Sequence, residues 1–261
     1  MKISSSSSSS FSSSKTIFIP GTIGALFVSA VLFFSLAARA QTNDLLRAET
    51  EGLALAQKIC AQGPAENLSN SAVLRIRPKG GEWTNCLVTS KAIVGRGYWK
   101  NIFTSDALKP AQEVFTVTHT PGQPNLYTHE STGGAAGRML PSSKFAPFAN
   151  SDFWLCDLAL DFFHWPEQRV LKKEFHRNCA CTVLESVNAG AEKGGYARVV
   201  TWIDNDSLAV VEAYGYDAGG KLLKEFTPKT FKKVNGQWTV KDIEIRNVQT
   251  GSRTRLEFEL K

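Results

Sequence analysis

The 261-residue sequence lacks the short motifs that mark the common classes of enzyme. It contains no Gly-x-Ser-x-Gly elbow, no His-Glu-x-x-His pair and no glycine-rich phosphate loop. Only four histidines are present, none in a recognisable catalytic context: His119, His129, His164 and His176. We therefore expect no enzymatic activity and no cofactor, and keep a hydrolase built on His129 and Cys179 as an alternative.

Acidic residues are absent from the first 40 positions, which carry three basic residues and a long apolar stretch. Ala38-Arg39-Ala40 then places small residues where a signal peptidase cuts, so residues 1–40 are typical of a secretory signal peptide. A membrane anchor is the alternative, because Ile17 to Ala38 is about 22 mostly apolar residues long. No cysteine follows this stretch as a site for a lipid, so we expect a soluble exported protein comprising residues 41–261.

Neither sign of charge dominates the part of the chain that would remain after cleavage. The formal net charge of the whole sequence is +6, but residues 41–261 carry 27 basic and 24 acidic side chains. This balance argues against a nucleic-acid partner. Hydrophobic residues make up 43% and charged residues 21%, which is enough apolar material for a sizeable core.

The number of cysteines is odd. The five cysteines all lie in the exported part, where disulfides can persist, and at least one must stay unpaired: Cys60, Cys86, Cys156, Cys179 and Cys181. Two disulfides would allow 15 arrangements. Cys179 and Cys181 are poor partners for each other, because residues two apart on a strand point the same way with Cα atoms about 6.5–7 Å apart, at or beyond the usual limit for a disulfide. His176, Cys179 and Cys181 also offer three soft-metal ligands, but without a fourth at a typical spacing we expect no metal site.

Two segments show the pattern of helices. Residues 43–62 repeat apolar side chains every three or four positions, which predicts an amphipathic helix of about five turns ended by Gly63-Pro64. A shorter and very apolar helix is expected from Phe153 to Trp165, capped by Ser151 or Asp152 and stopped by Pro166. Between the predicted strands and this second helix, Ser131 to Asn150 has no clear period and is expected to be a long loop.

Most of the remaining sequence alternates between apolar and polar side chains. Leu256, Phe258 and Leu260, for example, alternate with charged residues in the last segment, and Asn235-Gly236 predicts a tight hairpin. About ten or eleven strands follow one another through short turns, a pattern typical of an antiparallel meander with one dry face. We therefore predict a mainly β fold in which a curled antiparallel sheet is covered by two helices, forming one domain over residues 41–261.

Several segments of the C-terminal half, in their order and spacing, carry a resemblance to a known family. They are Ser151-Asp152-Phe153 with Asp157-Leu158, Cys181 to Glu185, Val199 to Asp204, Tyr216-Asp217 to Lys224, and Asn235-Gly236-Gln237-Trp238 to Ile245. Over roughly residues 137–261 the chain resembles an uncharacterised branch of the LolA-like outer-membrane lipoprotein-sorting proteins. The resemblance implies an incomplete antiparallel β-barrel closed by helices, a hydrophobic cavity, a periplasmic location, and non-enzymatic transport of lipoprotein acyl chains between membranes.

A carrier of this kind needs an apolar wall. The predicted lipid-binding residues are apolar side chains of the early strands and of the second helix: Leu74, Ile76, Trp99, Phe103, Phe115, Val117, Phe153, Leu158 and Phe162. The alternative is that these side chains simply fill a solid core, and that the protein is a structural or interaction module of the cell envelope without lipid cargo. For a carrier, the expected partners are lipid or lipoprotein acyl chains and the inner- and outer-membrane lipoprotein machinery.

Overall fold

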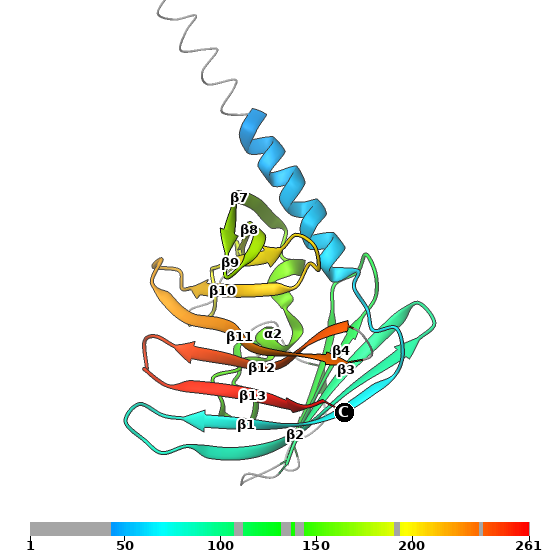
Figure 1. The fold of residues 1–261 in the computed structure, drawn as a ribbon, viewed down its shortest axis with the longest axis vertical. Helices are drawn as coiled ribbons and strands as arrows, with labels where there is room; N and C mark the ends of the chain where they lie inside the picture. The colour runs from blue at the N-terminus through cyan, green and yellow to red at the C-terminus, as the bar shows by residue number, and fades with distance from the viewer. Residues whose placement is uncertain are drawn as a thin grey trace, which may run out of the picture. The chain divides into compact units, whose positions relative to one another are not determined.

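A computed structural model shows one antiparallel sheet of 13 strands as the main feature of the chain (Figure 1). The structure describes residues 43–106, 112–131, 137–138, 144–190, 194–234 and 237–260. The chain divides into two units, Met1–Leu45 and Leu46–Lys261, and the second contains the whole sheet. The predicted signal peptide lies outside the described residues.

The sheet consists of two meanders that join through the first and last strands. Its order is β6-β5-β4-β3-β2-β1-β13-β12-β11-β10-β9-β8-β7, so the C-terminal strand pairs with the first strand and closes the middle of the sheet. The first meander comprises β1 (Leu68–Arg77), β2 (Thr84–Gly95), β3 (Tyr98–Ser105), β4 (Glu113–His119), β5 (Leu126–Ser131) and β6 (Gly137–Arg138). The second comprises β7 (Glu167–His176), β8 (Cys179–Val187), β9 (Arg198–Asp204), β10 (Val210–Tyr216), β11 (Leu222–Val234), β12 (Gln237–Asn247) and β13 (Arg253–Glu259).

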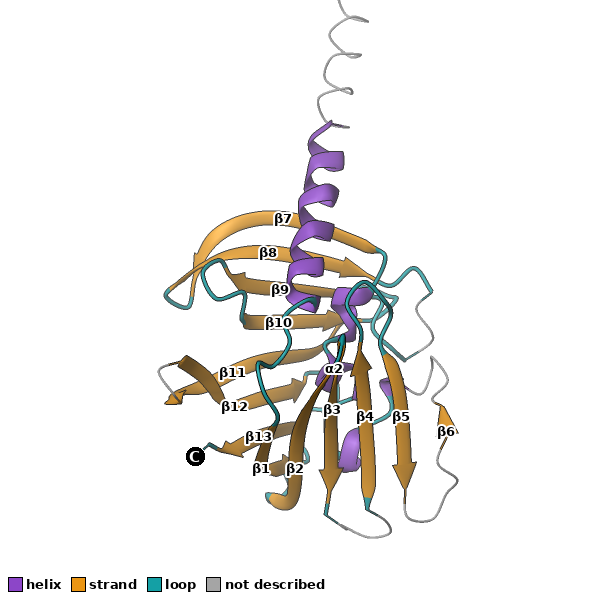
Figure 2. Ribbon diagram, turned by 90° about the vertical axis from the view of Figure 1, so that its right-hand side faces the viewer, coloured by secondary structure: helices purple, strands orange, loops and turns teal. Residues whose placement is uncertain are grey.

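The sheet curls strongly between its two halves. In Figure 2 the strands β7 to β10 run across the view, whereas β3, β4 and β5 run steeply to them, with α2 (Leu155–Ala159) inside the curve. Register shifts in β7, β10 and β11 mark bulges, which increase the local twist of a strand. The predicted fold class, a mainly β protein with a curled antiparallel sheet and two α-helices, is confirmed.

The concave face of the sheet is packed with apolar side chains in two clusters. The first is built around Leu74, Phe115 and Phe148 and joins β1–β5, β12 and β13 to α2 and the segment before it. The second is built around Phe163 and Ile203 and joins β8–β10 to the N-terminal helix. Because strand side chains alternate between faces, one row of each strand enters these clusters while the other meets solvent.

The second helix is shorter than its sequence predicts. It spans only Leu155–Ala159, Leu160 adopts a left-handed φ of 48°, and a 3-10 turn, η3 (Asp161–His164), follows. The predicted cap is also wrong, because the N-cap residue is Trp154, whose own backbone amide donates to the Asp157 carboxylate at 2.8 Å. Asp152 is held elsewhere: its carboxylate accepts hydrogen bonds from hydroxyls of the turn before β13 and of β13 itself.

A buried ionic network fixes this short helix to the sheet. Lys224 of β11 is 2% exposed, and its Nζ donates to the backbone oxygen of Asp152 at 2.7 Å and to the Asp157 carboxylate at 3.4 Å. The same ammonium lies 3.3 Å from the centre of the Trp154 ring, and the Tyr196 hydroxyl donates to Asp157 at 2.9 Å. Burial lowers the pKa of Lys224 against the opposing effect of Asp157. These contacts of Lys224 and Asp157 hold a helix that is shorter than the apolar pattern predicts.

The predicted N-terminal helix is confirmed and occupies residues 43–60. A glycine brings it onto the edge strand: a Cβ on Gly52 would lie 2.7 Å from the Arg169 backbone of β7. Beyond this contact Ala56 and Ile59 enter the second core cluster, whereas Leu46 and Leu53 are 56% and 44% exposed. The apolar face of the helix is therefore only partly covered.

All five cysteines are free thiols, so the two disulfides considered above do not form.

The predicted loop at Ser131 to Asn150 is only partly described. Residues 132–136 and 139–143 lie outside the described residues, and the rest contains the end of β5, the short β6 and a 3-10 turn, Phe148–Asn150. Asn235 and Gly236 also lie outside them, although Val234 pairs with Gln237 across that position.

Candidate functional site

Three segments that are far apart in the sequence meet around an opening at the ends of β3 and β4. They are the last turns of the N-terminal helix, the turn after β4, and the 3-10 segment before β7. The opening has a volume of about 540 Å³ and adjoins a smaller one of about 120 Å³ that also reaches Trp99. Both share Cys60, His119, Phe163 and His164, and we call the two together the rim pocket.

Packing against the core fixes each wall of the rim pocket. Phe163 is 4% exposed and belongs to the second core cluster, so the segment that carries His164 is anchored from below. His119, the last residue of β4, stacks on Trp99 of β3 with ring centres 5.1 Å apart. The Asn101 amide lies 3.2 Å from Nε2 of the same histidine. This ring is thus held from two sides before any ligand arrives.

The described residues that line the rim pocket carry no permanent charge. None of them is Asp, Glu, Lys or Arg; besides the four shared side chains they are mainly apolar, with amides and hydroxyls such as Gln57, Thr120 and Gln123. Burial lowers the pKa of both His119 and His164, and it raises the pKa of Cys60 to about 11. At neutral pH the pocket therefore presents neutral imidazoles and a protonated thiol, which is a poor nucleophile.

The nearest buried charges are neutralised beneath the pocket. The Asp161 carboxylate accepts a short hydrogen bond from the Tyr127 hydroxyl and pairs with the Lys144 ammonium at 3.1 Å. Burial and this carboxylate raise the pKa of Tyr127, so the phenol stays protonated. The buried amide of Asn125 has no hydrogen bond of normal geometry to the described residues, although it lies close enough to affect the pKa values of His119 and Tyr127.

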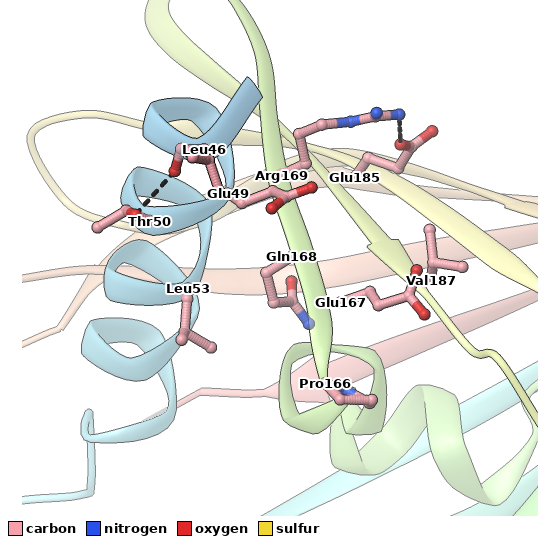
Figure 3. A pocket seen from close by; sticks show the side chains of 10 residues that line it. All are labelled: Leu46, Glu49, Thr50, Leu53, Pro166, Glu167, Gln168, Arg169, Glu185 and Val187. Atoms are coloured by element: carbon pink, nitrogen blue, oxygen red, sulfur yellow. Dashed lines mark hydrogen bonds and ion pairs between the residues drawn. The ribbon is translucent and has the colours of Figure 1, made fainter. Parts of the chain in front are cut away.

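A second opening lies on the other side of the N-terminal helix, between the helix and β7 (Figure 3). Its volume is about 440 Å³, and Leu53 and Pro166 line both it and the rim pocket. Four of its other lining residues are charged, namely Glu49, Glu167, and Arg169 paired with Glu185. Because carboxylates are expensive to cover with an apolar ligand, this opening is the poorer candidate for an acyl chain.

The predicted lipid-binding residues divide into two groups. Leu74, Phe103, Phe115, Val117 and Phe153 are buried in the first core cluster, Ile76 packs against it, and Phe162 is buried in the second. Trp99 and Leu158 instead line the rim pocket. Leu158 also packs against the first cluster, so it connects the pocket with the side chains that fill the concave face.

The remaining histidines and thiols form structural contacts. His129 lies 3.1 Å from the Glu113 carboxylate, and His176 lies 2.8 Å from that of Glu212. The Cys181 thiol contacts the backbone oxygen of His176 at 3.8 Å, and burial raises the pKa of Cys179. Across the described ranges no cluster of three or more His, Cys, Asp and Glu side chains is arranged to hold a metal ion.

Sequence reasoning missed most of the rim pocket. It recognised the helix at residues 43–62 and the apolar segment around Phe163, but did not bring them together with His119. The available signal was local: His164 stands between Phe163 and Trp165, and a histidine flanked by aromatic residues is a candidate for a partly apolar surface. The pairing with the turn after β4 depends on the curl of the sheet, which no local pattern encodes.

Comparisons with known proteins place this chain in a family. A family model described as an uncharacterized protein matches residues 101–260, which is more than half of the chain. The chain belongs to this family. No curated protein sequence matches it. Within the described part of the chain, no helix has both the length and the apolar character that crossing a membrane requires.

Similar solved structures show that this chain has a LolA-like fold, as the resemblance implied. A DUF1329 family protein from Desulfovibrio piger is 21% identical, with a TM-score of 0.66 over 81% of this chain and 91% of that one. A candidate outer membrane lipoprotein-sorting protein domain from Vibrio parahaemolyticus is also 21% identical, with a TM-score of 0.67 over 81% and 92%. A LolA superfamily protein from Nitrosomonas europaea is 14% identical, with a TM-score of 0.57 over 82% and 92%.

Proposed function

We propose that this protein is a periplasmic, non-enzymatic carrier that shelters an acyl chain of a lipid or lipoprotein. The observation that carries the proposal is the rim pocket, an opening of about 540 Å³ in which no described lining residue is permanently charged. Its volume falls in the range of ordinary ligand pockets, roughly 300–1,000 Å³. Transferring an acyl chain from water yields about 0.8 kcal/mol per methylene, so burying roughly ten methylenes gives about 8 kcal/mol before the entropic cost of binding.

The lining of the rim pocket agrees with a carrier better than with an enzyme. A carrier needs apolar contact and no nucleophile, and the Cys60 thiol, with its pKa raised to about 11, stays protonated. In this proposal Trp99 and Leu158 contact the acyl chain directly. The seven other predicted wall residues are buried in the two core clusters or packed against them, so in this proposal a chain longer than the rim pocket reaches them only by displacing that packing.

Transport also fits the remaining sequence evidence. The proposal includes cleavage of residues 1–40, a mature domain comprising residues 41–261, and exchange of the acyl chain with lipoprotein machinery of the inner and outer membranes. Amino-terminal sequencing of protein recovered from the periplasm tests the first part, with a mature start near Gln41 as the expected result. A start at Met1 in the membrane fraction would instead support the anchor.

Two substitutions on the N-terminal helix test the pocket itself. Leu53 lines the rim pocket and is 44% exposed, so Leu53→Asp places a carboxylate at the pocket without emptying the core. Leu46→Asp is the matched control, because Leu46 lies on the same helix, is 56% exposed, and lines only the charged opening of Figure 3. Binding of a fluorescent medium-chain fatty acid should weaken about tenfold or more with Leu53→Asp, since losing a buried leucine contact removes roughly 1.5–3 kcal/mol.

The outcomes of this test separate the two openings. Binding by the wild type, its loss with Leu53→Asp and its retention with Leu46→Asp support the rim pocket. Equal weakening by both variants would assign the ligand to the opening between the helix and β7. Failure of the wild type to bind any acylated probe would reject the carrier.

The edge of the sheet favours a second candidate, an interaction module of the cell envelope without lipid cargo. β7 ends the strand order, and its apolar side chains Leu171 and Phe175 are 43% and 73% exposed. An exposed apolar edge strand is a site at which another polypeptide can add a strand. Capture of one envelope protein by the wild type but not by Phe175→Ser, with no extractable lipid, would favour this function.

A further inference from the structure

Three arginines stand side by side on the outer face of the sheet. In β1 the buried Leu74 and the half-buried Ile76 point to the core, so Arg77 points to the opposite face. Arg77 pairs directly with Arg253 of β13, and Arg253 pairs directly with Arg246 of β12. Neighbouring strands lie about 4.8 Å apart, so the three side chains form one row across the sheet.

Further cations extend this row. Two residues back along β1, Arg75 pairs directly with Arg255 on the same outer face. Lys79, in the turn after β1, lies against the turn before β13: a Cβ on Gly251 would be 3.0 Å from Lys79 Cδ. We call these six residues the arginine patch: Arg75, Arg77, Lys79, Arg246, Arg253 and Arg255.

Carboxylates neutralise only part of the arginine patch. Three glutamates pair with it at 3.2–3.4 Å: Glu257 with Arg75, Glu244 with Arg255 and Glu225 with Arg246. Among the described residues, Arg77 donates a hydrogen bond only to the backbone oxygen of Gly81, and Arg253 forms no ion pair. Glu82, in the same turn as Lys79, is likewise not ion-paired within the described part of the chain.

Like charges directly opposite each other destabilise a sheet, so placing Arg77 and Arg246 on either side of Arg253 does not by itself stabilise the fold. Trp83 borders the patch, with the guanidinium groups of Arg75 and Arg77 lying 5.4 Å and 5.8 Å from its ring centre. Arginine binds phosphate oxygens with paired donors, and tryptophan favours the boundary between lipid headgroups and water. The chemistry of the patch is therefore complementary to a surface of phosphate groups.

We propose that the arginine patch docks this protein on the surface of an anionic phospholipid membrane. The patch lies on the outer face of β1, β13 and β12 and shares no residue with the rim pocket. Docking on a membrane and sheltering of an acyl chain are thus separate properties, and either can fail without the other.

Co-sedimentation with vesicles tests this proposal. The full chain should bind phosphatidylglycerol vesicles at low ionic strength, bind phosphatidylcholine vesicles weakly, and detach from the former as salt is raised. Arg77→Gln/Arg253→Gln should lower the partition coefficient about 30-fold, the combined effect of two basic residues at an anionic surface. The matched control is Lys173→Gln/Lys233→Gln, which removes two exposed cations from β7 and β11 and should change partition less than about threefold.

A stability measurement distinguishes docking from a structural role of the same arginines. Removing two members of a like-charged row should leave the midpoint of urea denaturation unchanged or raise it. Loss of vesicle binding at unchanged or greater stability supports the proposal. Equal loss of binding in the lysine control, or no binding of the wild type to phosphatidylglycerol vesicles, would overturn it, and an acidic protein partner would then be the better occupant.

Discussion

The buried ammonium of Lys224 provides the sharpest test of how the sheet holds its short helix. Its Nζ is surrounded by the backbone oxygen of Asp152, the Asp157 carboxylate and the Trp154 ring. Lys224→Met keeps most of the side-chain volume but removes the ammonium, which leaves the 6%-exposed Asp157 without a cation. Removing one partner of a buried ion pair typically destabilises by about 3–5 kcal/mol.

That loss is a large fraction of the roughly 5–15 kcal/mol by which domains are stable. Urea denaturation followed by circular dichroism and by tryptophan fluorescence measures it, since Trp154 contacts the substituted side chain. Lys221→Met is the control, because Lys221 is exposed and lies three residues away; it should change the free energy of unfolding by less than about 0.5 kcal/mol. Adding Asp157→Asn to Lys224→Met should restore part of the stability, because the stranded charge disappears.

The reasoning would be refuted if Lys224→Met destabilised the protein by no more than the Lys221 control. It would also be refuted if Asp157→Asn added its full effect to that of Lys224→Met, because the two side chains would then act independently. Either result would mean that apolar packing alone holds α2 in the curve of the sheet.

Three further predictions follow from burial and close contact. His119 and His164 have lowered pKa values in the folded protein, so the unfolded chain takes up protons first as the pH falls. The stability that the two histidines contribute is therefore complete above about pH 6.5 and falls as the pH drops below it. The double variant His119→Gln/His164→Gln should make the free energy of unfolding, measured by urea denaturation, depend less on pH below about 6.5. Gly52→Ala should lower the free energy of unfolding by about 1–3 kcal/mol despite the better helix propensity of alanine, because its Cβ meets the Arg169 backbone; an unchanged or higher urea midpoint would contradict the close contact. Without reductant, a thiol reagent should titrate all five cysteines in denaturant but leave Cys156 unmodified in the native protein, and fewer than five in denaturant would reveal a disulfide.

Local patterns in the sequence were sufficient for most of the sheet. The alternation in Leu256, Phe258 and Leu260 predicts a strand with one face on the core; β13 contains Leu256 and Phe258 and ends one residue before Leu260. The predicted N-terminal helix is present because its apolar positions recur at helical spacing. These elements depend on interactions between neighbours in the sequence, which a pattern records directly.

Local patterns did not predict the extent of the second helix. Nearly every side chain from Phe153 to Phe163 is apolar or buried, so the sequence cannot indicate which turn is helical. The position of the helical turn depends on partners that are distant in the sequence. The Lys224 ammonium donates to the Asp157 carboxylate, and the Thr254 hydroxyl of β13 donates to the Asp152 carboxylate. The rim pocket also depends on contacts between distant parts of the sequence, because its two histidines lie 45 positions apart and are brought together by the curl of the sheet.

The carrier proposal is tested most directly by native mass spectrometry of the protein purified without detergent from the periplasm. We expect a population heavier than the polypeptide by the mass of a lipid, which disappears on denaturation and is reduced in the Leu53→Asp variant. Repeated detection of the bare polypeptide, together with no uptake of added acylated ligand, would contradict the account.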